Sequence, residues 1–373
     1  MQDTTLFTQL LTTFVIVLLL RNNENAEGSL ACLVFFLMQT LDRKYQNMLV
    51  RIISNNPIRN PREGRVEVSF NRGAKWGTLC SSSWSFREGN VVCRQLGLGF
   101  AAMVNQTTTF GDSKSYPWAM IGTLCRGNEK RLSDCIREST YPRNCTVGNK
   151  NVAVVRCVPQ SADLTLGLRD IETSARLDLA PMTRLTCAME ENCVSAEAYI
   201  IRRTQPSAIR NLLRFTTKAE NVGDADFSPY ANYKDWEWHQ CHQHYHSMNV
   251  FATFDVYDFS YRKVAQGHKA SFCLMDTNCV PGVRPKYTCG NETQGISIGC
   301  ADLYTANLDC QWVDVTGLPV NQYYILRVAI NPEYKIGERN FENNGAECII
   351  HYTGKPATTR ITNCRRTPLS FNV

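Results

Sequence analysis

The alternation of apolar and polar side chains along the chain predicts strands far more often than helices. β-Branched and aromatic residues are enriched at 152–157, 323–330 and 348–352, which is typical of β-strands. The clearest helical segment is 87–96, with Ser85 as its N-cap and a glycine directly after it. We therefore predict a mostly β protein in which long loops connect the strands.

Two apolar runs lie near the N-terminus. Residues 6–20 form a mostly apolar run of 15 residues that ends at Arg21, and a second run covers 30–38. Both are shorter than the roughly 18 residues that a membrane-spanning helix needs. The length of the first run fits a signal peptide, with a type II membrane anchor as the alternative. We expect 1–41 to be an N-terminal apolar segment and the arginine-rich 42–60 to be a basic linker.

The composition is that of an ordinary folded protein, with 43% hydrophobic and 20% charged residues. The formal net charge of +6 and the pI near 8.5 favour acidic surfaces on partners. Nucleic acid is not expected as a partner, because the sequence contains no nucleic-acid-binding motif. Nothing in the sequence specifies an oligomeric state.

The 17 cysteines indicate an oxidising compartment, since a reducing cytosol does not sustain so many unless they bind metal. The chain has no Cys-x-x-Cys pair of the kind that metal sites and redox motifs use. Cys32 lies in the second apolar run, and without it an even 16 remain, six between 80 and 157 and ten from 187 onward. We predict a secreted protein whose loops are held by two groups of disulfides.

Residues 236–248 hold four of the six histidines. In a strand, side chains two residues apart share one face at a spacing of about 6.6 Å, so His242, His244 and His246 can converge on one metal ion. In a helix, His239, His242 and His246 would also share a face. The flanking tryptophan, tyrosine and cysteine residues favour the strand. Imidazole nitrogens suit zinc, copper, iron or nickel, so the pattern indicates a metal site without specifying the metal.

This histidine-rich segment, Trp-Glu-Trp-His-Gln-Cys-His-Gln-His-Tyr-His-Ser-Met, resembles the copper signature of the lysyl oxidases. Further matching motifs follow in the same order, namely Gly-His-Lys-Ala-Ser-Phe-Cys at 267–273, Gln-Gly at 294–295, Cys300, Tyr304 and Asp-Cys-Gln-Trp at 309–312. The likeness runs from about residue 163 to residue 364. It implies a β-rich catalytic domain with irregular, disulfide-stapled loops, which we expect to occupy 159–373.

The resemblance implies that His242, His244 and His246 hold copper(II), and that Lys269 and Tyr304 form a covalent lysine tyrosylquinone. From the residues alone, Lys269 would be an ordinary surface lysine and Tyr304 a half-buried aromatic. The chemistry needs these residue types, because copper and dioxygen can oxidise a nearby phenol to an ortho-quinone. An unprotonated amine can then add to that ring, which requires a lowered pKa at the lysine.

The implied activity is that of a protein-lysine 6-oxidase. The quinone carbonyl condenses with a primary amine, loss of the α-proton moves two electrons into the cofactor, and hydrolysis releases an aldehyde. Dioxygen reoxidises the cofactor, which yields hydrogen peroxide and ammonia. The family's substrates are lysines of extracellular matrix proteins such as collagens and elastin, whose aldehyde products cross-link.

The sequence departs from the family pattern just after the histidine-rich segment. Family members read Phe-x-His-Tyr-Asp there, and the histidine has been suggested as the catalytic base. This chain reads Phe-Ala-Thr-Phe-Asp at 251–255, and Thr253 cannot accept a proton at neutral pH. Asp255 and His239 are the remaining candidates for the base.

Two other functions are compatible with parts of the pattern. A catalytically silent extracellular binding protein would use the oxidase fold only as a scaffold. A zinc hydrolase would use the three histidines but would leave Lys269 and Tyr304 without a role. The presence of all three ligands and both cofactor precursors favours the oxidase.

The six-cysteine segment resembles a scavenger receptor cysteine-rich domain, a small α+β fold, over 61–158. Six cysteines alone allow 15 connectivities. The family pattern implies three pairs, Cys80–Cys145, Cys93–Cys157 and Cys125–Cys135. Ser81 and Ser82 stand where an acidic pair often binds calcium in such domains, so calcium is not expected there. The domain is expected to bind partners, to position substrate, or to act as a spacer.

The lysyl oxidase resemblance also implies disulfides and a calcium site in the catalytic domain. The implied disulfides are Cys187–Cys241, Cys193–Cys310, Cys273–Cys289, Cys279–Cys300 and Cys348–Cys364. The implied calcium ligands are Asp163, the carbonyl of Leu164, Glu338, Asn340, Asn343 and Asn344, all of them hard oxygen donors that suit calcium. Asn340 replaces the usual aspartate, so weaker binding is expected, and an ordinary polar turn is the alternative.

Three asparagines match the acceptor pattern for glycosylation, which is relevant in a secreted chain. They are Asn105, Asn144 and Asn291. Asn144 borders an implied disulfide.

Overall fold

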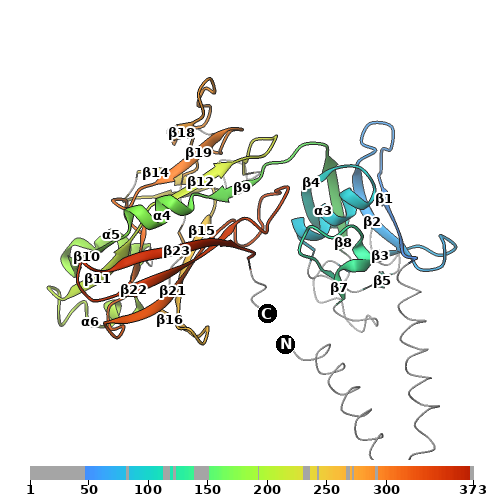
Figure 1. Ribbon diagram of the computed structural model, residues 1–373. Coiled ribbons are helices and arrows are strands. Elements are labelled where there is room, and N and C mark those ends of the chain that lie inside the picture. The colour runs from blue at the N-terminus through green and yellow to red at the C-terminus, as the bar shows by residue number, and fades with distance from the viewer. Residues whose placement is uncertain are drawn as a thin grey trace, which may run out of the picture. The chain divides into compact units, whose positions relative to one another are not determined.

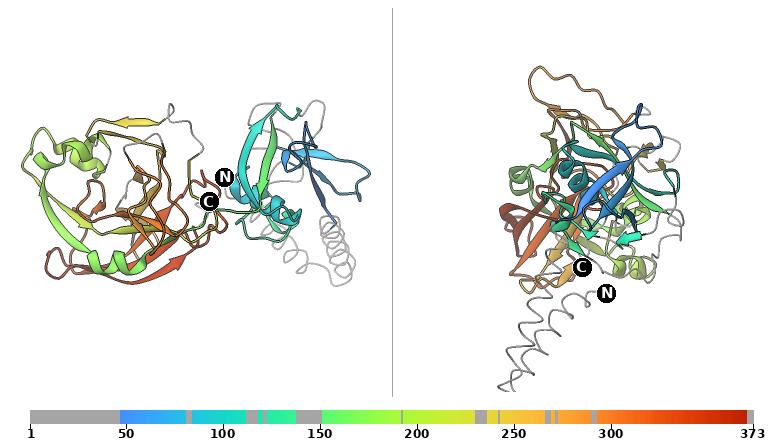
Figure 2. Two further views of the ribbon diagram at one scale, coloured as in Figure 1. Left: turned by 90° about the horizontal axis from the view of Figure 1, so that it is seen from above. Right: turned by 90° about the vertical axis from the view of Figure 1, so that its right-hand side faces the viewer.

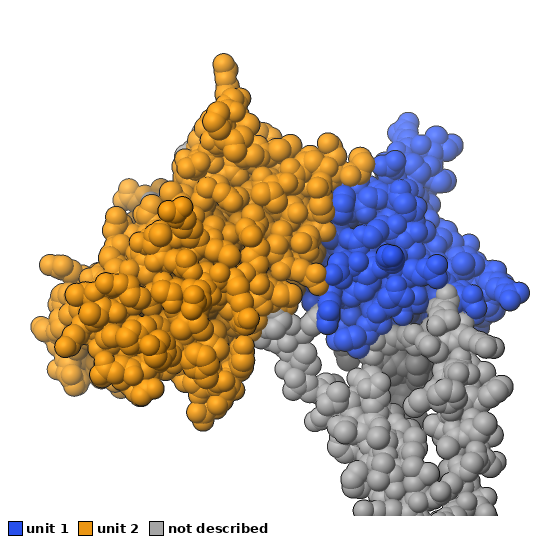
Figure 3. Space-filling view, viewed as in Figure 1, with its two compact units in different colours: residues 1–158, 371–373 blue, residues 159–370 orange. Residues whose placement is uncertain are grey.

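The computed structural model describes residues 47–80, 84–111, 118–120, 123–137, 151–191, 193–229, 236–241, 243–265, 269–270, 273–289 and 293–369. The chain forms two compact units, residues 1–158 with 371–373 and residues 159–370 (Figure 3). Both apolar runs of the N-terminus lie outside the described residues, as does the expected signal peptide or anchor. No helix within the described ranges is long and apolar enough to span a membrane.

The first unit is built on a sheet with the strand order β4-β8-β2-β3-β5, and β1 pairs with β2 (Figure 1). Only β3 and β5 pair in parallel among the strands described here. The strands of this sheet are β1 (Leu49–Ile53), β2 (Glu63–Ser69), β3 (Gly77–Leu79), β4 (Phe100–Thr107), β5 (Trp118–Met120) and β8 (Val152–Val158). A small ribbon joins β6 (Thr123–Leu124) to β7 (Ile136–Arg137).

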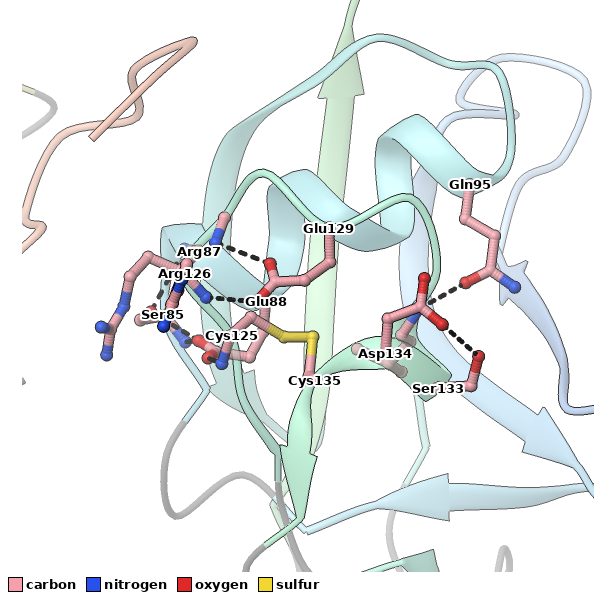
Figure 4. Close-up of a disulfide and its surroundings, with 12 residues drawn as sticks. Ser85, Arg87, Glu88, Gln95, Cys125, Arg126, Glu129, Ser133, Asp134 and Cys135 are labelled. Atoms are coloured by element: carbon pink, nitrogen blue, oxygen red, sulfur yellow. Dashed lines mark hydrogen bonds between the residues drawn. A yellow bond between two sulfur atoms is a disulfide. The ribbon is translucent and has the colours of Figure 1, made fainter. Parts of the chain in front are cut away.

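Helix α3 (Phe86–Gln95) confirms the predicted helix and its cap. The Ser85 hydroxyl accepts from the Arg87 amide at 3.2 Å, and Glu88 Oε2 accepts from the Ser85 amide at 2.9 Å (Figure 4). This reciprocal capping box satisfies amides that would otherwise lack partners. Glu88 Oε1 accepts from the Cys125 amide at 2.8 Å, so the same side chain ties the helix to the Cys125–Cys135 loop.

The expectation of a linker at 42–60 is wrong for residues 49–53, which form strand β1 of the sheet. The stretch Leu-Val-Arg-Ile-Ile is apolar and β-branched, and Val50 is buried. Arg51 packs its guanidinium 4.0 Å from the centre of the Trp76 ring and pairs with the buried Glu67. These contacts compensate the charge that suggested an exposed linker.

The second unit contains most of the strands, in several small sheets. The largest sheet has the strand order β16-β15-β21-β22-β23, and the short β17 also pairs with β15. Strands β22 and β23, red in Figures 1 and 2, lie side by side. Its strands are β15 (Ala252–Tyr257), β16 (Lys263–Ala265), β17 (Lys269–Ala270), β21 (Gln322–Ile330), β22 (Gly345–Tyr352) and β23 (Arg360–Thr367). The predicted strands at 323–330 and 348–352 are therefore confirmed, and β8 confirms the one at 152–157.

Three further sheets complete the second unit within the described residues, in the orders β18-β19-β12-β9, β10-β11-β20 and β13-β14. Their strands are β9 (Leu164–Leu166), β10 (Arg176–Pro181), β11 (Ile209–Arg214), β12 (Thr217–Asn221), β13 (Glu237–His239), β14 (His244–His246), β18 (Asn278–Cys279), β19 (Cys300–Tyr304) and β20 (Trp312–Asp314). The helices are α4 (Leu168–Ser174), α5 (Thr186–Glu190) and α6 (Ala196–Ile201). The mostly β fold with long loops is thus as predicted.

Disulfides hold the loops of both units. Seven pairs are formed within the described residues, Cys93–Cys157, Cys125–Cys135, Cys187–Cys241, Cys193–Cys310, Cys273–Cys289, Cys279–Cys300 and Cys348–Cys364. These are pairs that the two resemblances imply. Cys80 is also disulfide-bonded, and its implied partner Cys145 lies outside the described residues.

Candidate metal and cofactor site

The histidine-rich segment folds as a hairpin rather than as one long strand. β13 and β14 pair antiparallel, and the Gln243 amide donates to the His239 carbonyl at 2.7 Å to close the turn. Gln243 has a φ of 54°, a left-handed conformation that reverses the chain. The predicted strand therefore begins at His244. His242 and the side chain of His244 lie outside what the structure describes.

The imidazoles of His239 and His246 stack across the hairpin, with ring centroids 3.6 Å apart. His246 is buried, at 1% exposure, whereas Trp238 and Tyr245 on the other face are 48% and 43% exposed. Because successive strand residues alternate in direction, one face of the hairpin carries histidines inward and the other presents aromatics to solvent. His239 and His246 therefore share a face because they lie on paired strands, and not because the segment is helical. The described part of the segment is strand and turn.

Two tethers fix the hairpin to the rest of the unit. The Cys187–Cys241 disulfide attaches the turn to helix α5. Gln294 attaches β14 to the chain near Leu274, because its Oε1 accepts from the amides of Ser247 and Leu274, both at 3.2 Å. The Gln294 amide nitrogen also donates to the Tyr245 carbonyl at 2.6 Å. The Gln-Gly motif at 294–295 therefore has a structural role that the sequence reading left open.

A carboxylate also lies beside the histidines. Glu191 Oε1 is 3.6 Å from His239 Nδ1. His239, one of the two candidates for the base, therefore has the Glu191 carboxylate beside it.

Tyr304 is buried, at 4% exposure, rather than half-buried as expected. Its hydroxyl donates to Asp302 Oδ2 at 2.5 Å, and the Met275 amide donates to the same oxygen at 2.9 Å. Burial raises the pKa of Asp302 to about 7. Burial, together with the Asp302 carboxylate, also raises the pKa of the Tyr304 phenol.

Asp302 was not singled out from the sequence, although a signal was present. Asp302 and Tyr304 are two residues apart in β19, so their side chains share one face of the strand. Buried polar groups are nearly always hydrogen-bonded, so a carboxylate and a phenol on the same buried face are expected to form a hydrogen bond.

Lys269 lies in strand β17, where its Cα pairs with that of Thr253 in β15. Thr253 is the position at which the lysyl oxidase resemblance leads us to expect a histidine. The position of the missing histidine is therefore directly opposite Lys269 in the sheet. The side chain of Lys269 is outside the described part of the chain.

Asp255, the other candidate for the base, lies in β15 and is half-buried. Its Oδ1 is 2.7 Å from Lys263 Nζ. Phe254 belongs to the buried core cluster that also contains Tyr304. Because neighbouring strand residues point to opposite faces, Asp255 shares a face of β15 with Thr253 and not with Phe254. Its described partner is a lysine at the surface rather than Tyr304.

The residues of the implied calcium site lie close together. Glu338 Oε2 accepts from the Leu164 amide at 2.6 Å, and Glu338 Oε1 accepts from the Asn344 side chain at 2.7 Å. The Asn343 side chain donates to Asp163 Oδ1 at 2.9 Å. This arrangement joins the loop at 338–344 to the start of the unit.

The donor set fits a hard cation. Within the described residues, the buried side-chain oxygens of Asn343 and Asn344 have no hydrogen-bond partner. Burial raises the pKa of Glu338 to about 8, and burial also raises the pKa of Asp163. A calcium ion would satisfy these oxygens and stabilise both carboxylates in their ionised form. Asn340 also takes part in a turn, since its Oδ1 accepts from the Glu342 amide at 3.0 Å.

Of the three glycosylation matches, only Asn105 lies within the described residues. It is exposed on β4, which is compatible with an attached glycan. Asn144 and Asn291 lie outside, and so do Ser81 and Ser82.

These features define a β-rich domain held by disulfides, with a hairpin whose inner face carries His239 and His246 and with a buried pair of Tyr304 and Asp302. The sequence profile of the lysyl oxidases, described as "Lysyl oxidase", matches residues 162–364, more than half of the chain. The chain belongs to the lysyl oxidase family. The profile described as "Scavenger receptor cysteine-rich domain" matches residues 58–158.

Several curated relatives are similar over most of this chain. Lysyl oxidase homolog 2A of Danio rerio is 43% identical over 301 residues, which cover 79% of this chain and 40% of the relative. Lysyl oxidase homolog 2 of Gallus gallus is 42% identical, covering 83% of this chain and 40% of the relative. Lysyl oxidase homolog 4 of Homo sapiens is 42% identical, covering 79% and 39%. The chain therefore spans about 40% of the length of these relatives.

Several solved structures match this chain, and a scavenger receptor cysteine-rich domain is among them. The third SRCR domain of murine neurotrypsin is 36% identical, and the match covers 30% of this chain and 95% of that chain with a TM-score of 0.25.

Proposed function

We propose that the protein is a secreted, copper-dependent protein-lysine 6-oxidase that acts on lysines of extracellular matrix proteins. One observation carries the proposal. In a member of the lysyl oxidase family, the tyrosine that would become the quinone is buried and its phenol is held by a carboxylate. Seven disulfides among the described residues support an extracellular setting.

The residues fit the groups that this activity needs. His242, His244 and His246 would hold copper(II), and the inward face of the hairpin offers the imidazole nitrogens that this metal prefers. Lys269 and Tyr304 would form the lysine tyrosylquinone. When present, copper and the quinone supply the oxidation of a primary amine to an aldehyde, with dioxygen accepting the electrons as hydrogen peroxide.

The surrounding residues orient the reacting groups and exclude water. The Cys187–Cys241 disulfide and Gln294 hold the hairpin in place. The buried cluster around Tyr304 includes Phe251, whose ring centroid is 5.7 Å from that of Tyr304, and it keeps the ring away from solvent. Preorganisation of this kind lowers the cost of aligning a substrate amine.

The activity is tested by supplying the full chain with a lysine-containing peptide in air. We expect hydrogen peroxide and a peptidyl aldehyde in equal amounts. If a fully copper-loaded protein releases no hydrogen peroxide, the alternative is favoured, a catalytically silent extracellular binding protein. In that case the scavenger receptor unit would carry the function.

Thr253→His is expected to raise the turnover rate, by at least about tenfold if the histidine acts as a general base. The substitution places an imidazole at the position opposite Lys269 in the sheet. Steady-state peroxide release measures the effect. Thr362→His, on the outer surface of the same sheet in β23, is the control and should leave the rate unchanged. An unaltered rate in Thr253→His would discard the role of this position.

We also propose that Asp163, Leu164, Glu338, Asn343 and Asn344 bind calcium, with Asn340 as a weaker member of the set. The two buried amide oxygens without partners in the described part of the chain support this.

Saturating calcium is expected to raise the melting temperature by about 5–10 °C, because a ligand at 100 times its dissociation constant adds about 2.7 kcal/mol. Glu338→Gln should remove most of this increase in melting temperature, since glutamine has the size of glutamate but lacks its negative charge. Glu342→Gln, in the same loop but outside the ligand set, should keep it. An equal calcium response in all three proteins, measured by thermal unfolding, would contradict the site.

A further inference from the structure

The function proposed so far uses the contact between Tyr304 and Asp302 as support but assigns Asp302 no chemical role. Both side chains are buried, at 4% and 1% exposure. The phenol donates to Asp302 Oδ2 at 2.5 Å, and the backbone amide of Met275 orients the same oxygen. The carboxylate is thus placed against the one atom of Tyr304 that can lose a proton.

Conversion of a phenol to a quinone is easier from the phenolate, because the anion gives up electrons more readily. A buried phenol has no access to bulk water as a proton acceptor, and its burial raises the pKa of Tyr304. Ring oxidation in this core therefore needs a base within hydrogen-bond reach.

We propose that Asp302 accepts the proton of the Tyr304 phenol when the quinone cofactor is formed, and so controls cofactor formation. This inference rests on the proposed function. The proton moves from Tyr304 Oη to Asp302 Oδ2, which leaves a phenolate and a neutral carboxyl group. No other bond changes in this step, and the later oxidation of the ring by dioxygen belongs to the proposed oxidase chemistry.

Asp276 is the other acidic group that acts on Asp302, and its negative charge opposes ionisation of Asp302. Asp276 is itself satisfied by other donors. Its Oδ1 accepts from the Ser297 amide at 2.8 Å, and its Oδ2 accepts from the Lys286 amide at 2.7 Å. It does not contact Tyr304 in any described hydrogen bond, which makes it a suitable control.

The neighbouring strand β12 adds no charge on the buried side. Thr217 and Ala219 pair with Tyr304 and Asp302 across the sheet. The charged Lys218, which alternates with them, points away from that side and pairs with Glu220 at 2.5 Å. Tyr304 and Asp276 are therefore the titratable groups among the described residues that face Asp302.

This geometry predicts how cofactor formation depends on pH. Burial raises the pKa of Asp302 to about 7, so the carboxyl is neutral below that pH and cannot accept a proton. The rate of cofactor formation should fall about tenfold for each pH unit below 7 and level off above it.

The test uses the full chain prepared without copper and then given copper(II) in air. Mass spectrometry follows the Lys269–Tyr304 cross-link, visible absorbance follows the quinone, and copper content is measured in parallel. In Asp302→Asn we expect cross-linking at least 100-fold slower than in the wild type, without the dependence on pH, while copper content stays equal. Asp302→Glu should recover part of the rate, and Asp276→Asn should retain the rise of rate with pH.

Infrared titration of the copper-free protein provides a readout that does not need the cofactor. A carboxyl band that titrates near pH 7 should disappear in Asp302→Asn and shift in Tyr304→Phe. Cross-linking of Asp302→Asn at the wild-type rate and with the wild-type pH profile would overturn the inference and leave the oxidase proposal intact. A copper-loaded wild-type protein that never forms the cross-link would overturn both.

Discussion

Tyr304→Phe is expected to abolish amine oxidation, with a loss of at least about 10³-fold in peroxide release, because the ring then lacks the oxygen from which a quinone is built. Copper content should remain that of the wild type, since the three proposed histidine ligands are untouched. The fold should persist as well. Loss of one buried hydroxyl costs about 1 kcal/mol, and the ring still fills its place in the core.

The matched control is Tyr324→Phe. Tyr324 is also buried, at 5% exposure, and its hydroxyl donates to the Pro319 carbonyl at 2.8 Å. The change removes one buried, hydrogen-bonded hydroxyl from the same unit, so it matches the structural cost of Tyr304→Phe without touching the cofactor. We expect full activity in Tyr324→Phe. Amine-dependent peroxide production that survives in Tyr304→Phe would refute the assignment of the cofactor.

His246→Ala is expected to weaken copper binding by more than about 100-fold, because groups that merely support metal ligands already account for 10- to 100-fold. His246 is buried on the inner face of the hairpin and stacks on His239. Without copper, Lys269 and Tyr304 should stay unlinked. Copper titration and peptide mapping of the same preparation would measure both effects.

His351→Ala is the control for this change. His351 stacks on Tyr323 in the sheet β21–β22, with ring centroids 4.7 Å apart, and it lies outside the histidine-rich segment. Its loss removes an imidazole from the same unit without affecting the proposed ligands. Copper affinity that is unchanged in His246→Ala would show that this residue is not a ligand.

The elements that could be predicted from the sequence are those set by local chemistry. Ser85 and Glu88 fix the start of α3 through their reciprocal hydrogen bonds. The strands at 323–330 and 348–352 carry their β-branched pattern in the chain itself. Strand β1 was missed because Arg51 suggests an exposed linker. Its partners, Glu67 and Trp76, are distant in the sequence and contact it only in the folded protein.

The candidate site could be predicted in its residues but not in its arrangement. Alternating histidines indicated a strand, yet the position of the turn depends on the left-handed Gln243 and on the tether of Cys241 to Cys187. Asp302 shares a strand face with Tyr304, but only tertiary packing buries the pair and shifts both pKa values. The Cys187–Cys241 disulfide and the burial of Asp302 and Tyr304 depend on segments distant in the sequence, and no local pattern encodes them.

A peptide map of the secreted, copper-loaded protein by mass spectrometry tests the central claim most directly. We predict a covalent Lys269–Tyr304 cross-link in a protein that carries bound copper. Separate, unmodified peptides containing Lys269 and Tyr304 from a fully copper-loaded preparation would contradict the oxidase and favour an extracellular binding protein.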